Sequence, residues 1–194
     1  MFILPPKNVP IYIASLGPKN LRMTGEMADG WLGGSFLPEH ADLFLDPIRE
    51  GAEAAGRSLD DIDLQVGGTI WFTDDVDEAV KTLKPGLAFS IGAMGSRQHN
   101  FYNDAYRRQG FADEAREVQR LWLAGERDEA RARVPDEMVL GSNLIGDKQM
   151  IRERLRVYRD AGINTFRAGP RGDTLSDRLD TLGRFMEVVD EVTA

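Results

Sequence analysis

The turn formed by residues 15–20 has the composition of an anion-binding loop. Gly17 lets the backbone approach a ligand closely, and a helix that starts beyond it would present unpaired N–H groups and the positive end of its dipole to a phosphate. Lys19 adds a positive charge. The turn is neither a Walker loop nor a GxGxxG fingerprint. A plain strand-to-helix turn with a solvated lysine therefore stays the alternative interpretation.

A second candidate is the run Gly169-Pro170-Arg171-Gly172, which follows the last short apolar segment. The guanidinium of Arg171 is able to bind an anion through two parallel hydrogen bonds. An exposed turn is the alternative interpretation.

Polar and aromatic side chains gather in residues 94–102, where Arg97 and His99 are candidates for facing a substrate. His99 has no second histidine and no cysteine at metal-ligand spacing, so a solvated or structural histidine is the alternative. We find no Ser-His-Asp order and no metal signature. The sequence therefore predicts no metal site and leaves the catalytic residues unassigned.

Composition narrows the class of protein. The chain has 32 acidic and 24 basic residues, a formal net charge of −8, and no cysteine. This balance argues against a nucleic-acid surface, which requires clustered Lys and Arg. No stretch approaches the ~20 apolar residues of a membrane span. Without cysteine there is no disulfide scaffold and no thiol catalysis, so we predict a cytoplasmic protein that acts on a small molecule.

The candidate residues depend on the elements that position them. Short apolar runs predict four buried parallel strands at residues 11–15, 31–34, 64–72 and 165–168. Helical patterns separate these runs. In the helical segment 38–56, Pro47 is expected to break a continuous helix, so that Asp46 caps a new one.

A long helical segment, about residues 76–135, follows the third strand and exceeds a normal crossover. We expect an insertion of several helices, joined at Pro85-Gly86, Gly95, Gly110 and Gly125.

The regular pattern then resumes. Asp147 is expected to cap a helix that ends at Gly162. The last helix carries one apolar stripe over four turns, formed by Leu175, Leu179, Leu182, Met186 and Val189.

Four β–α units in series predict an α/β fold, either a small open parallel sheet or part of a (β/α)8 barrel. A barrel normally needs ~250 residues. Without the insertion, this chain of 194 residues has length for about half of one. We treat residues 1–194 as a single domain.

Several linked stretches resemble the bacterial-luciferase-like oxidoreductases. The mid-chain signature of that family is similar to residues 9–19 (VPIYIASLGPK) and 25–31 (GEMADGW). The branch that uses the deazaflavin coenzyme F420, which includes the methylene-tetrahydromethanopterin reductases, resembles the later stretches IGAMGSR (91–97), NFYN (100–103), YRRQGF (106–111), VPDE (134–137) and LIG (144–146).

This resemblance implies a TIM barrel with inserted helices, in which a reduced flavin or deazaflavin moves a hydride or activates oxygen. The four strands would be its fifth to eighth, so the chain is expected to be a partial TIM (β/α)8 barrel, the C-terminal half of an F420-dependent oxidoreductase. An FMN-dependent monooxygenase of the same superfamily is the alternative. The phosphate-bearing tail of F420 would then bind the turn at Ser15, Leu16, Gly17, Lys19 and Asn20. On the substrate side we place Arg97, His99 and Arg171.

Members of the family begin with four further β–α units, which supply most of the pocket for the reactive ring. The chain is thus expected to be a truncated or mis-started copy, a half that pairs with another chain, or a fragment that no longer catalyses. An open half barrel would expose two sheet edges and an apolar inner face. We therefore expect a homo-oligomer or a complementing N-terminal half chain as partner. A non-catalytic, oligomerising subunit is the alternative from another class.

Overall fold

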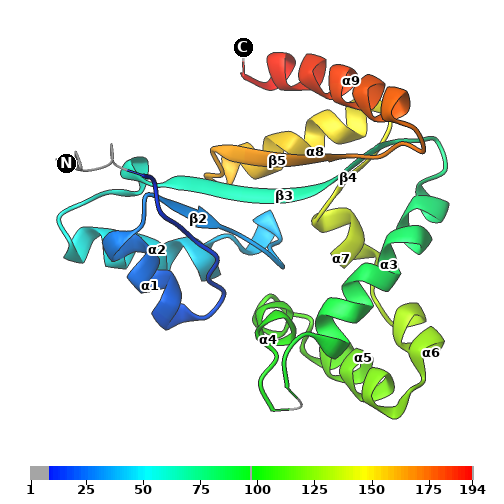
Figure 1. Cartoon of the computed structure of the whole chain (residues 1–194), viewed down its shortest axis with the longest axis horizontal. Coiled ribbons are helices and arrows are strands. Elements are labelled where there is room, and N and C mark those ends of the chain that lie inside the picture. Colours follow the sequence, from blue (N-terminus) through cyan, green and yellow to red (C-terminus); the bar gives the residue numbers. More distant parts are fainter. Residues whose placement is uncertain (1–8, 97, 194) are drawn as a thin grey trace, which may run out of the picture.

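The computed structural model describes residues 9–96 and 98–193. One parallel sheet lies beside a separate lobe of helices (Figure 1). The strands are β1 (Tyr12–Ile13), β2 (Gly30–Leu32), β3 (Asp63–Phe72), β4 (Leu144–Gly146) and β5 (Thr165–Pro170). The helices that cover the sheet are α1 (Pro18–Met27), α2 (Asp42–Ala54), α8 (Lys148–Asp160) and α9 (Leu175–Thr193).

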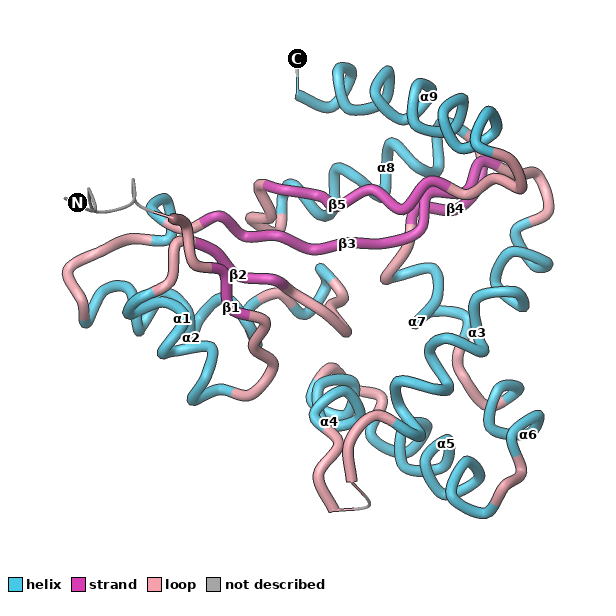
Figure 2. The backbone as a smooth tube through the Cα atoms, viewed as in Figure 1, coloured by secondary structure: helices cyan, strands magenta, loops and turns pink. Residues whose placement is uncertain are grey.

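Strand β3 organises the sheet, because three other strands pair with it in parallel (Figure 2). Gly30 of β2 pairs with Asp63 at its beginning, and β5 runs along its middle. The short strand β4 pairs with its last three residues, and β1 lies on the outer side of β2. The four predicted strands are present, each followed by a helix, and β4 with α8 adds a fifth β–α unit. The sequence did not predict β4, because three residues are too few to show a period.

The core lies between the sheet and its helices, where Trp31, Phe44, Ile70 and Tyr158 are almost completely buried. Helices α1 and α2 approach each other closely enough to exclude a side chain. A Cβ on Gly25 would lie 1.9 Å from the carbonyl oxygen of Ile48. Glycine is therefore required for this contact.

Helix α2 corrects the expectation for Pro47. The helix begins at Asp42 after a 3-10 turn at Pro38–His40 and continues through Pro47 without a break. Proline removes one hydrogen bond there. The burial of Phe44, Leu45 and Ile48 on this helix outweighs that loss, so Asp46 caps no second helix.

The lobe lies where the insertion was expected, but it continues beyond the expected end at about residue 135. It comprises α3 (Val76–Ala93), α4 (Phe101–Arg108), α5 (Ala112–Ala124), α6 (Arg127–Ala132) and α7 (Asp136–Gly141), and it has a hydrophobic core of its own. Three predicted joints are confirmed, because Gly95, Gly110 and Gly125 have positive φ angles between the helices. The fourth is wrong, since α3 continues through Pro85.

Two expectations about buried surface are also corrected. Strand β1 is an edge strand of two residues rather than a run of five buried ones, and Ile11 is 61% exposed. On β3, Leu64, Val66 and Ile70 enter the core, so the alternate residues face the inner side of the sheet. These include Asp63 and other polar residues, so the inner face at β3 is not the apolar one expected.

The ends of the last two helices follow the sequence closely. The carboxylate of Asp147 accepts the N–H of Met150 at 2.8 Å, and α8 ends before Gly162, whose φ is 93°. No helix in the described part of the chain is long and apolar enough to cross a membrane.

Candidate functional site

The turn that follows β1 leads directly into the first turn of α1. Gly17 precedes the helix with φ −84° and ψ 148°, no side chain caps it, and Pro18 occupies the first helical position. The N–H groups of Lys19 and Asn20 are thus among the donors that an α-helix leaves without an acceptor in its own backbone. A Cβ on Gly17 would meet nothing within 4 Å, so the backbone here is open to a ligand.

The predicted turn residues have different surroundings. Ser15 is buried, its hydroxyl lies 2.8 Å from that of Thr24, and its carbonyl accepts the indole N–H of Trp31 at 2.9 Å. Ser15 therefore holds the turn in place with its side chain facing inward. Lys19 and Asn20 are exposed. The carbonyl of Leu16 accepts a hydrogen bond from Arg108.

A cavity of about 510 Å³ opens between this turn and helices α4 and α5. We call it the basic pocket, and its lining residues are Gly17, Pro18, Phe101, Asp104, Arg107, Arg108, Ala112 and Arg116. Three guanidinium groups against one carboxylate leave it with an excess of positive charge. Such an excess beside a helix N-terminus favours an anionic ligand.

Each arginine of the basic pocket keeps donors available. Arg107 contacts Asp104 at 3.1 Å, but its Nε is buried without a hydrogen-bond partner. Arg108 lies over the ring of Phe44, 5.5 Å from its centroid, and burial lowers the pKa of its guanidinium. Arg116 pairs with the exposed Asp113 at 2.9 Å. An anion in the pocket would neutralise this excess of positive charge and accept hydrogen bonds from guanidinium N–H groups.

Buried amide side chains hold α4 in this position. Asn100 accepts the N–H groups of Tyr102 and Asn103, at 3.1 and 3.0 Å, and so caps the start of α4. The amide of Asn103 donates to the carbonyls of Ile91 and Ala115. The lobe and the pocket wall are therefore tied together through polar groups that are already satisfied.

Gln109 joins the lobe to the loop after β2. Its side chain is 1% exposed, accepts the N–H of Leu37 at 2.8 Å and donates to the carbonyl of Ser35 at 2.7 Å. Ser35 has φ 49°, which is uncommon for a residue with a side chain. Gln109 thus holds a strained loop at the carboxyl end of β2, the end where α/β barrels bind their ligands.

The residues predicted for the substrate side are not brought together. Arg97 lies outside the described residues. His99 is exposed in the connection between α3 and α4, and it does not line the basic pocket. Arg171 follows β5, where its guanidinium lies 4.6 Å from the ring centroid of Trp71. The α3–α4 connection and the beginning of α9 lie far apart in Figure 1.

Glycines after β2 and within β3 differ in how closely other atoms approach them. A Cβ on Gly33 would lie 2.7 Å from the Trp31 ring, and one on Gly68 would lie 2.5 Å from the carbonyl of Ser142. These two glycines serve packing. A Cβ on Gly34 would meet nothing within 4 Å.

A polar cluster occupies the inner face at the amino end of the sheet. The Asp63 carboxylate accepts hydrogen bonds from Tyr12 at 2.9 Å, Gln65 at 2.7 Å and Thr165 at 2.5 Å. Burial alone would raise the pKa of Asp63, but these three donors together hold it below its ordinary value. Barrels bind their ligands at the carboxyl ends of the strands, and this cluster lies at the amino ends. We therefore assign it a structural role, which is to join β1, β3 and β5.

Sequence reasoning missed the arginines of the basic pocket and Gln109. In the sequence, residues 106–111 are distinguished only by their resemblance to the family. Arg107 and Arg108 in the last turn of α4 give a local signal of positive charge. Their position opposite Gly17 depends on how the lobe folds back, and no local pattern carries that information. Among the described residues, no group of three His, Asp or Glu side chains is arranged to hold a metal ion.

A parallel sheet of β–α units, with a basic pocket at the carboxyl end of its first strand, defines the class, an α/β half barrel. The comparisons give the family. The chain belongs to the luciferase-like monooxygenase family, whose model matches residues 1–165.

Relatives in this family support the fold and its extent. A protein of Mycobacterium tuberculosis that is described as a coenzyme F420-dependent oxidoreductase is 34% identical over 158 residues, which is 80% of this chain and 46% of the relative. The F420-dependent tetrahydromethanopterin reductase of Methanopyrus kandleri superposes with a TM-score of 0.67 and 23% identity, over 90% of this chain and 49% of the other. An F420-dependent secondary alcohol dehydrogenase superposes with a TM-score of 0.69 and 19% identity, over 97% of this chain and 50% of the other. The chain spans about half the length of the curated relatives that it matches. The fold is a partial TIM barrel.

Proposed function

We propose that this chain takes part in hydride transfer with coenzyme F420, and that it binds the phosphate-bearing part of that cofactor in the basic pocket. The relatives named above are described as F420-dependent. The observation that carries the proposal is the position of three arginines, Arg107, Arg108 and Arg116, in one pocket with the amino end of α1. Phosphate fits this donor set in charge and in hydrogen-bonding capacity.

The residues of the chain share the binding in a definite way. The open backbone at Gly17 allows close approach, and the N–H groups of Lys19 and Asn20 donate to phosphate oxygens. Arg107 and Arg116 neutralise the charge from the opposite wall. When bound, F420 supplies a deazaflavin ring that gives or accepts a hydride. Gln109 positions the Ser35 loop at the mouth of the strands, beside the region where that ring is expected.

An FMN-dependent monooxygenase of the same family is the second candidate. The description of the matching family model favours it, since that family is named for its monooxygenases. FMN also carries a phosphate, and the basic pocket suits both cofactors. The basic pocket alone therefore does not distinguish F420 from FMN.

Fluorescence titration tests the proposal directly. We expect the purified chain to bind F420 and to bind it more weakly as salt is raised, because the contacts are ionic. FMN is titrated in competition, and tighter binding of FMN would favour the monooxygenase. The titrations are repeated with a polypeptide that supplies the other half of the barrel. Absence of F420 binding under both conditions would refute the proposal.

A further inference from the structure

Helix α9 has two apolar faces, and only one of them packs against the rest of the described chain. The face formed by Thr181, Phe185, Val188 and Val192 is buried. The stripe visible in the sequence lies on the other side. Leu175, Leu179 and Met186 are 74%, 59% and 49% exposed, and Leu182 and Val189 are half-buried. Val189 packs partly against the core, and the other four residues form an apolar row at helical spacing that is largely open in the described chain.

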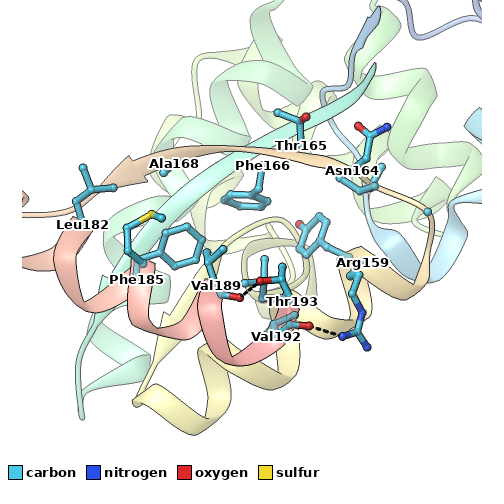
Figure 3. A pocket seen from close by; sticks show the side chains of 15 residues that line it. Arg159, Asn164, Thr165, Phe166, Ala168, Leu182, Phe185, Val189, Val192 and Thr193 are labelled. Atoms are coloured by element: carbon cyan, nitrogen blue, oxygen red, sulfur yellow. Dashed lines mark hydrogen bonds between the residues drawn. The ribbon is translucent and has the colours of Figure 1, made fainter. Parts of the chain in front are cut away.

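A cavity of about 580 Å³ lies beside this row, between α9, α8 and β5 (Figure 3). Phe166 and Ala168 of β5 line it on one side, and Leu182, Met186 and Val189 of α9 on the other. The cavity and the exposed row together form one surface, which we call the α9–β5 surface.

The polar groups around this cavity bind within the chain. The guanidinium of Arg159 donates to the carbonyl of Val192, and the hydroxyl of Thr193 donates to that of Val189 (Figure 3). The amide of Asn164 bonds to the backbone of β3 and of the preceding residue Ile62. A small polar ligand would find few free groups to orient it here. The surface suits apolar side chains of another polypeptide.

The free edge of strand β5 has backbone groups that a partner strand could pair with. It pairs with β3 from Thr165 to Pro170, and no other strand of the described residues pairs with its second edge. Residues 167–169 are exposed. An open edge offers unpaired N–H and C=O groups to a further strand, and a barrel closes only when each strand has two neighbours.

We propose that the α9–β5 surface docks a complementary half barrel, a polypeptide of β–α units whose first strand pairs in parallel with β5 and whose helix covers Leu179, Leu182 and Met186. The occupant follows from length and fold. This chain superposes over 90–97% of its length on about half of each of two solved chains. The other half of such a barrel would pair with both open edges of the sheet, at β1 and at β5.

A second copy of this chain fits the edge less well. The strand that a copy would present to β5 is β1, which has two residues, whereas the open edge of β5 has six. Two residues would leave most of the β5 edge unpaired. The α9–β5 surface shares no lining residue with the basic pocket, so this proposal stands or falls independently of cofactor binding.

The test uses the segment of the Mycobacterium tuberculosis relative that this chain does not span, co-expressed with the full chain. Light scattering after size exclusion gives the stoichiometry, and hydrogen exchange reports the amides of residues 167–169. We expect a one-to-one complex and slower exchange at these amides. The double variant Leu182→Glu and Met186→Glu is expected to weaken the complex about 100-fold or more, because two apolar anchors become charged.

A matched control uses Met150→Glu, since Met150 is 42% exposed on α8 and does not line the cavity. It should leave the complex unchanged. Circular dichroism confirms that each variant keeps its helices. Three results would overturn the proposal: no complex and free exchange at residues 167–169, a complex that survives the double variant, or a dimer of the chain alone that protects β5.

Discussion

The hydroxyl of Tyr12 on β1 reaches across β2 to the carboxylate of Asp63 on β3, at 2.9 Å. Gly30 of β2 lies beneath the Tyr12 ring, and a Cβ there would lie 2.1 Å from its Cε1 atom. A residue without a side chain in the middle strand therefore permits a hydrogen bond between the strands on either side.

Replacing Gly30 by alanine tests this relationship. The added methyl group must displace the Tyr12 ring and break its bond to Asp63, so we expect Gly30→Ala to lower the free energy of unfolding by about 1–3 kcal/mol. Urea unfolding measures the change. Gly34→Ala is the control, because a Cβ on Gly34 meets nothing within 4 Å, and equal effects at both positions would contradict the relationship.

The same pair predicts a dependence on alkaline pH. The hydrogen bond to Asp63 raises the pKa of the Tyr12 phenol above its usual 10.0, because that bond requires the protonated phenol. A pKa that is higher in the folded chain stabilises it below the unfolded pKa, and this contribution is lost as pH rises through the folded pKa. Stability should therefore fall above about pH 10. Tyr12→Phe should flatten the fall, and an unchanged slope would count against the pair.

Gln109 is expected to be essential for joining the lobe to the sheet. Gln109→Leu leaves the N–H of Leu37 and the carbonyl of Ser35 buried without their partner. We expect a loss of about 2–4 kcal/mol in the free energy of unfolding, since each unsatisfied buried group costs about 1–3 kcal/mol. Gln149→Leu is the control, because Gln149 is exposed and bonds only to Glu153. Similar losses for both variants would show that Gln109 has no special role.

Two arginines on α5 form a matched pair for testing the basic pocket. Arg116 and Arg120 each pair with an acid three residues before, and each has a side chain that is 58% exposed, but only Arg116 lines the pocket. We expect Arg116→Gln to raise the dissociation constant for F420 about 3- to 10-fold and Arg120→Gln to leave it unchanged. Equal effects would mean that only net charge matters.

Gly17→Ala separates a binding turn from a plain turn. The residue has an ordinary negative φ and open space around it, so alanine should change stability by less than about 0.5 kcal/mol. The methyl group would occupy the space into which a phosphate must come, and we expect F420 binding to weaken clearly. Unaltered binding would support the plain turn. Thermal unfolding and fluorescence titration measure the two effects.

The order of the β–α units and the ends of several elements could be predicted, because their signals are local. Gly95, Gly110, Gly125 and Gly162 mark helix ends through their own backbone preference. The prediction at Pro47 was wrong. The hydrogen bond that proline removes is a local effect, whereas the burial of α2 that outweighs this loss depends on residues distant in the sequence.

The candidate site was predictable only on one side. The turn at Gly17 has a local pattern, whereas Arg107 and Arg116 reach it through the folding of the lobe. The stripe on α9 was visible as well. Its periodicity shows that one face is apolar, but does not show whether this chain or another polypeptide covers it.

Because β3 pairs with three other strands, its position in the sequence affects the order in which parts of the chain fold during synthesis. The backbone N–H of Leu64 bonds to the side chain of Asn164, 100 residues later. At a synthesis rate of ~5–20 residues per second, β3 waits roughly 5–20 s for this contact and for β5. The lobe needs mainly residues 76–145 for its own core and becomes available first. During translation, the inserted helices can thus provide folded structure beside a sheet that is still incomplete.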